Sequence, residues 1–213
     1  MFDPIRIRYP RWIKVLWWLS CPIPWLIGFA AFALASPNTA VAGQPMGMPA
    51  FVLSLAGAYW LALVFHETGH AAAAWWFSRP IQAVNVWPIR FYKSQSRWRL
   101  DWNITAAFGG EVEYCEPVDQ FNFAEHVWIS LAGPIANLFA FGAMLLAAHF
   151  NRNGSEVPLL FTIIGTMNLV AGFYALGPRG NTPLSDGDIV LAAFAWRRRF
   201  PIGSSSQGDT GSG

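Results

Sequence analysis

The sequence predicts an all-α polytopic membrane protein with about four transmembrane helices and a short β-containing cytoplasmic loop. Of its 213 residues, 54% are hydrophobic and only 12% are charged, whereas soluble domains average about 25% charged residues. Four mainly apolar stretches, the second interrupted only at 66–70, are each long enough to cross about 30 Å of hydrocarbon as a helix. They lie near residues 15–35, 50–77, 127–150 and 157–177.

The first stretch is the least regular of the four. Pro22 and Pro24 lie within it and are expected to kink the helix. A basic lead-in and small-residue sequences near 33–35 and 40–42 would also suit a cleavable signal peptide. Residues 1–49 are therefore expected to form an N-terminal segment with a first span, and whether that span is retained stays open.

The basic residues predict a cytoplasmic N-terminus. In that orientation, every Lys and Arg except Arg152 lies on the cytoplasmic side, as the positive-inside rule requires. The second span then runs from outside to inside whether or not the first is cleaved. Residues 66–70 are therefore expected toward its cytoplasmic end.

The cytoplasmic loop 78–125 contains short alternating patches at 83–87 and 97–102, which favour β-strands, and Gly109-Gly110 punctuates it. A basic, aromatic loop of this kind would also suit a surface that faces lipid headgroups. Residues 50–200 are expected to form the membrane core. The Gly/Ser-rich tail 201–213 is expected to be disordered.

An HExxH motif, Phe65-His66-Glu67-Thr68-Gly69-His70, lies inside the second apolar stretch. Residues four apart share one face of a helix, so His66 and His70 can each offer an imidazole nitrogen to one zinc ion. Glu67 lies about 100° further round, where it can reach a water on that metal without being a ligand. Ionisable groups are costly inside an apolar span, which favours a functional site over a chance match.

A tetrahedral catalytic zinc needs a third protein ligand and one open position. The candidates outside the motif are His126, His149, Asp186 and Asp188. His149 lies near the outer face, and His126 at a membrane edge is more often simply solvated. Asp186 and Asp188 follow the fourth span at the right depth, although an aspartate there would also suit a turn that caps the helix after it.

Further motifs lie on separate segments after HExxH: Phe108-Gly109-Gly110-Glu111-Val112, Leu131-Ala132-Gly133-Pro134-Ile135-Ala136-Asn137 and Leu184-Ser185-Asp186-Gly187. In this order, over about residues 50–196, they resemble the Gly-Gly, AGPxxN and LDG elements of the site-2 protease family of intramembrane zinc metalloproteases, with a serine inserted in LDG. With no inserted PDZ domain, the chain resembles minimal members of that family. The family's asparagine before LDG is missing, because Leu176-Gly177-Pro178 keeps only the proline.

The resemblance implies one zinc ion per chain, held by His66, His70 and Asp186, with Glu67 as the catalytic base. It implies that Gly109 and Gly110 form a strand edge that pairs with an extended substrate. Asn137 is expected to hold substrate or the oxyanion of the reaction, although an asparagine there would also suit a hydrogen bond between packed helices.

The expected function is cleavage of membrane-anchored, single-span proteins near the cytoplasmic face. The expected partners are such a substrate and the lipid bilayer, with no nucleic acid. The absence of a luminal domain or disulfide pattern favours a bacterial or archaeal plasma membrane, with the active site expected toward the cytoplasmic side. Two other classes compete: a catalytically silent scaffold or chaperone, which would not need Glu67, and a metal transporter, for which four spans are few.

Overall fold

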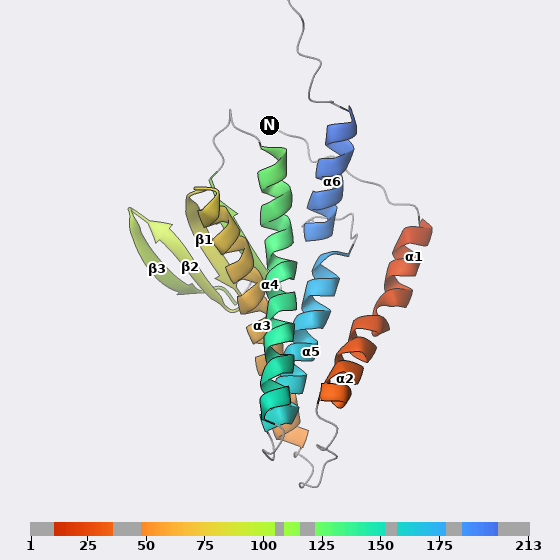
Figure 1. Cartoon of the computed structure of the whole chain (residues 1–213). Helices are drawn as coiled ribbons and strands as arrows, with labels where there is room; N and C mark the ends of the chain where they lie inside the picture. Colours follow the sequence, from red (N-terminus) through yellow and green to blue (C-terminus); the bar gives the residue numbers. More distant parts are fainter. Residues whose placement is uncertain are drawn as a thin grey trace, which may run out of the picture.

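Helices α3, α4 and α5 pack side by side at the centre of the computed structural model, and a small sheet flanks one end of α3 (Figure 1). The structure describes residues 11–35, 48–104, 109–115, 122–151, 157–177 and 185–199. The expected disordered tail and the 40–42 part of the signal-peptide pattern lie outside these residues. The helices are α1 (Arg11–Ser20), α2 (Pro22–Ala35), α3 (Met48–Trp76), α4 (Phe123–Phe150), α5 (Val157–Ala175) and α6 (Asp186–Arg199).

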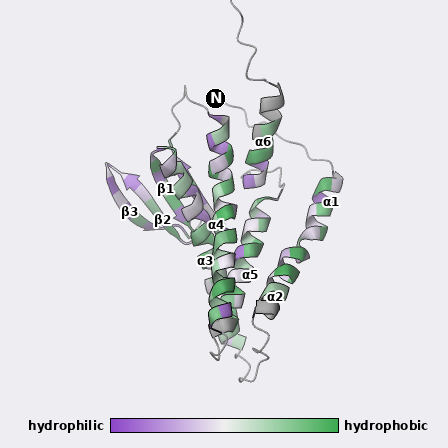
Figure 2. Cartoon of the chain, viewed as in Figure 1, coloured by the Kyte–Doolittle hydropathy of each residue, from purple (hydrophilic) through white to green (hydrophobic). Residues whose placement is uncertain are grey.

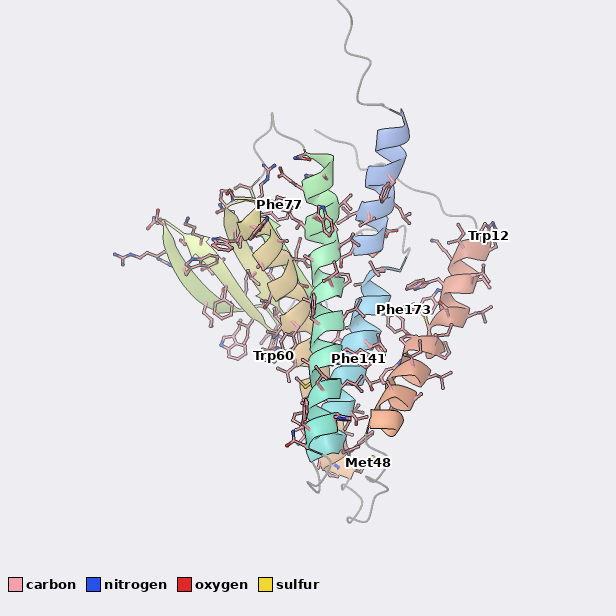
Figure 3. All side chains as sticks on the ribbon, viewed as in Figure 1. Trp12, Met48, Trp60, Phe77, Phe141 and Phe173 are labelled. Atoms are coloured by element: carbon pink, nitrogen blue, oxygen red, sulfur yellow. The ribbon has the colours of Figure 1, made fainter. Side chains whose placement is uncertain are left out.

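Among the described residues, three helical segments are long and apolar enough to span a membrane: Trp12–Ala31, Met48–Trp76 and Ala124–Phe150. Leu159–Ala175 is also apolar but shorter. The expectation of a mostly helical membrane protein is thus confirmed at the level of three candidate spans, and a fourth span stays a prediction. Trp12 and Phe77 lie at one end of the bundle and Met48 at the other, so α3 runs in the opposite direction to α1 and α2 (Figure 3).

The expected kink in the first span is a break at Cys21, between α1 and α2. Pro22 is the first residue of α2, a position where its missing N–H removes no helical hydrogen bond. Before the break, the Trp17 ring of α1 stacks on Phe173 of α5 with ring centroids 4.5 Å apart. This contact holds α1 against the end of α5.

Hydrophobic residues predominate along the central helices (Figure 2), and polar groups are buried in the interior of the bundle. Large apolar side chains point outward; Trp76 is 77% exposed and Phe139 is 76% exposed. Buried polar side chains gather among the helices instead: His66, Glu67, His70, Asn137, Thr166, Asn168 and Asp188. Such an arrangement suits a hydrocarbon surrounding, where polar groups need partners inside the protein.

The predicted β-containing loop is a four-stranded antiparallel sheet of β1 (Ile81–Val86), β2 (Ile89–Ser94), β3 (Arg97–Trp102) and β4 (Gly110–Tyr114). Its strand order is β3-β2-β1-β4, so β3 and β4 are the edges. Both β1 and β4 contact α3. The Arg79 guanidinium pairs with Glu125 in the first turn of α4, which ties the start of the sheet to that helix.

Helices α3 and α4 approach closely at Gly69. A Cβ atom placed on Gly69 would lie 2.8 Å from the carbonyl carbon of Ala132 and 2.8 Å from the Cβ of Ala136, both on α4. Glycine is therefore required for this contact, as in other membrane helix interfaces built on small residues. The contact sets the depth at which α4 meets the HExxH turn.

We expect Gly69→Ala to lower the free energy of unfolding by about 1–3 kcal/mol, the usual cost of overpacking a tight contact. Thermal unfolding in detergent measures the effect. Gly57→Ala is the matched control on the same helix, because a Cβ there meets nothing within 4 Å. Equal stability of the two variants would contradict the packing argument.

Candidate metal centre

The two histidines of the HExxH motif converge on one point in the bundle. Both lie on the buried face of α3, one helical turn apart. Their Nε2 atoms are 3.1 Å apart, and their rings meet edge to face with centroids 4.7 Å apart. Two ring nitrogens directed at the same point are a typical beginning of a metal site.

Asp186 completes the cluster from the start of α6. Its Oδ2 lies 2.9 Å from Nε2 of His66, and its Oδ1 lies 3.4 Å from Nε2 of His70. One donor atom from each residue lies within 4.8 Å of the other two, so the three could hold a metal ion. Ligand atoms around a tetrahedral zinc are separated by about 3.4 Å, so the observed spacings suit such an ion.

Asp186 lies in a mostly buried, strongly interacting setting. Burial alone would raise the pKa of its carboxyl, but the neighbouring His66 and His70 imidazoles outweigh burial and lower that pKa below its ordinary value. The carboxylate is therefore held in its charged form, the form that binds metal.

A capping box at the start of α6 explains why Asp186, rather than Asp188, reaches the histidines. The Ser185 hydroxyl accepts from the Asp188 N–H at 3.1 Å, and the Asp188 Oδ2 accepts from the Ser185 N–H at 3.1 Å. Asp188 is thereby engaged in capping, which leaves Asp186 one residue past the cap. The turn predicted for this segment is thus present, and it uses Asp188.

The cap also fixes α6 to the end of α5. The Ser185 hydroxyl donates to the carbonyl of Gly177. A Cβ on Gly187 would lie 2.6 Å from the carbonyl carbon of Leu176, so only glycine allows this approach. The position of the Asp186 carboxylate therefore depends on the junction between the two helices.

Each histidine has a second partner on α4. Nδ1 of His70 lies 2.6 Å from the carbonyl oxygen of Ile129, and Nδ1 of His66 lies 3.1 Å from Nδ2 of Asn137. Because a carbonyl can only accept, His70 must carry its proton on Nδ1, which leaves its Nε2 lone pair free for a metal. Outer partners of this kind orient histidine ligands in metal sites.

Two glycine backbones form walls of the site. A Cβ on Gly133 of α4 would lie 2.7 Å from Cε1 of His70 and 2.8 Å from Nε2 of His66. A Cβ on Gly110 at the start of β4 would overlap the Glu67 carboxyl group. Side chains at these positions would fill the space of the ligands and of the glutamate.

Glu67 lies beside the cluster and is only 3% exposed. Its carboxylate interacts electrostatically with His70, Asp186 and Glu111. Its Oε2 atom has no hydrogen-bond partner among the described residues. A buried carboxylate oxygen without a partner is costly, and a water bound next to the metal position would satisfy it.

The structure also places the other predicted site residues. Gly109 accepts the Trp87 N–H at 3.0 Å, and Gly110 begins β4 next to Glu67. Asn137 is fully buried and its amide contacts His66. Its expected role in holding substrate stays a prediction. His126 contacts the Tyr114 hydroxyl at the start of α4, and His149 lies at the other end of that helix.

Sequence reasoning missed the Ile129 carbonyl, the capping role of Ser185 and the contact of Gly133 with the two histidines. Ser185 had a readable local signal, since a serine three residues before an acidic residue is a capping pattern. Comparison with protein-family models, curated proteins and solved structures found no match.

The two aspartates of α6 should separate metal binding from helix capping. We expect Asp186→Ala to lose stoichiometric binding of metal, with zinc as the probe, because it removes one of the three residues that could hold a metal ion. Asp188→Ala should keep zinc near one per chain and lower stability by about 0.5–2 kcal/mol through loss of the cap. Metal analysis and thermal unfolding of both purified variants measure the two effects, and loss of zinc only in Asp188→Ala would refute the assignment.

Proposed function

We propose that this protein is an intramembrane zinc metalloprotease that cleaves membrane-anchored proteins, as the resemblance to the site-2 protease family implies. The observation that carries the proposal is the buried Oε2 atom of Glu67, which has no hydrogen-bond partner among the described residues, beside the His66, His70 and Asp186 cluster. A purely metal-storing or structural site needs the three ligands but not that glutamate. The apolar exterior of α3 supports a reaction that takes place within the membrane.

Each residue of the site would have a separate role in hydrolysis. When bound, a zinc ion would supply an activated water at neutral pH and would polarise a peptide carbonyl. Glu67 would accept a proton from the attacking water at its free Oε2 and then donate that proton to the leaving amine. Asp186, His66 and His70 would hold the metal, and their second partners on α4 would keep the two rings oriented.

A helical substrate hides its carbonyl groups in internal hydrogen bonds, so the cleaved segment must be extended. Strand β4 is an edge strand, and its first residue lies against Glu67. Trp87 donates to the Gly109 carbonyl, so Gly109 directs its backbone polar groups toward β1. Because this direction alternates from one residue to the next along an antiparallel ladder, Val112, three residues on, directs its N–H and C=O away from β1. This free edge supports the proposal that an extended substrate pairs with β4.

Glu67→Gln should abolish cleavage of a single-span test substrate in proteoliposomes. The amide cannot accept the proton of the attacking water, whereas the three metal ligands remain, so zinc content near one per chain is expected to persist. Equal cleavage by the variant and the wild type would refute the protease mechanism. No cleavage by either protein, with zinc bound in both, would favour a silent scaffold.

A proline on the free edge of β4 should impair substrate pairing. Val112→Pro removes an outward N–H, so we expect a several-fold fall in cleavage with zinc still bound. Leu100→Pro is the matched control, because the ladder register also turns its N–H outward on the opposite edge strand, β3. Equal cleavage by the two variants would contradict a pairing role for β4.

A further inference from the structure

Asn137 is fully buried in the middle of α4, and its amide meets the side of the His66 ring that faces away from the metal position. Its Nδ2 lies 3.1 Å from Nδ1 of His66. Its Oδ1 is also buried and has no hydrogen-bond partner among the described residues. A buried amide oxygen without a hydrogen-bond partner destabilises the fold.

This orientation of the amide dictates the tautomer of His66. An amide nitrogen can only donate, so Nδ1 of His66 must accept and the ring proton must lie on Nε2. That proton points at Oδ2 of Asp186, 2.9 Å away. A protonated Nε2 has no lone pair for a metal, so the arrangement is self-consistent as a hydrogen-bond network but cannot ligate zinc.

Turning the amide by about 180° about its last side-chain bond exchanges oxygen and nitrogen with little change in shape. Oδ1 would then face Nδ1 of His66 and accept a proton from it. The ring proton would lie on Nδ1 and the Nε2 lone pair would face His70 and Asp186. The same turn gives the unpartnered oxygen its hydrogen bond.

We propose that Asn137 is a positioning residue for the metal centre, whose side-chain oxygen accepts the Nδ1 proton of His66 and so selects the tautomer that binds metal. The Ile129 carbonyl does the same for His70 at 2.6 Å. Residues of α4 thus determine the tautomers of both histidines. The backbone carbonyl of Ile129 is a fixed acceptor for His70, whereas the Asn137 amide can turn either its oxygen or its nitrogen toward His66. The inference rests on the metal centre of the proposed function and not on proteolysis itself.

Zinc affinity of the full-length protein in detergent, measured by competition with a chelator, tests this role. Asn137→Leu removes the acceptor and should weaken zinc binding about 10- to 100-fold. Asn137→Asp presents oxygen on both sides, so its affinity should stay near that of the wild type. Asn168→Leu is the control: Asn168 is also fully buried, but its amide donates to Ile164 within its own helix.

Unchanged affinity in Asn137→Leu, or a loss in Asn137→Asp equal to that in Asn137→Leu, would overturn the proposal. Should the variants fail to fold, nuclear magnetic resonance of wild-type protein with labelled asparagine decides. Zinc should shift the side-chain amide signals of Asn137 and leave those of Asn168 unchanged; an unmoved Asn137 would overturn the turned amide.

These measurements also distinguish the positioning role of Asn137 from the proposed protease function. If the wild type binds no zinc, both the metal centre and the positioning role of Asn137 are refuted. If zinc binding depends on Asn137 but the protein has no proteolytic activity, the positioning role of Asn137 is supported and only the protease function is refuted.

Discussion

The need to compensate polar groups inside an apolar bundle governs the architecture of this protein. A histidine or carboxylate loses its hydration among membrane helices and is tolerated only where partners replace that water. Asp186 compensates both histidines, and α4 provides each histidine with a second contact. At the edge of the bundle, the buried Arg79 is compensated by Glu125. The site is therefore a point at which three helices must meet.

Such a meeting requires backbones to approach more closely than side chains usually allow. Gly69 permits α4 to touch α3, Gly133 leaves room for the two imidazoles, and Gly110 lets β4 lie on Glu67. The glycines thus act at different surfaces of one small volume. Substituting any one of them would disturb a different contact: the packing of α3 against α4, the two imidazoles or the Glu67 carboxyl group.

The local parts of this site were predictable from the sequence, and the relations between distant segments were not. Histidines four apart on an apolar helix are readable, because helical geometry alone places them on one face. Asp186 could be chosen over Asp188 only by resemblance, since the choice depends on a cap that ties Ser185 to Asp188. The strands expected at 83–87 and 97–102 correspond to β1 and β3, but their order and the place of Gly110 over Glu67 arise from tertiary packing.

The distance along the chain between the candidate ligands would give a bound metal a mechanical role as well. His66 and Asp186 are 120 residues apart, and α6 is joined to the bundle mainly through α4 and the Ser185 cap. A metal held by both would be a cross-link that closes a very long loop, much as a disulfide does. Metal supply would then govern how firmly the C-terminal helix is anchored, so metal-starved protein would be the form that quality-control proteases attack first.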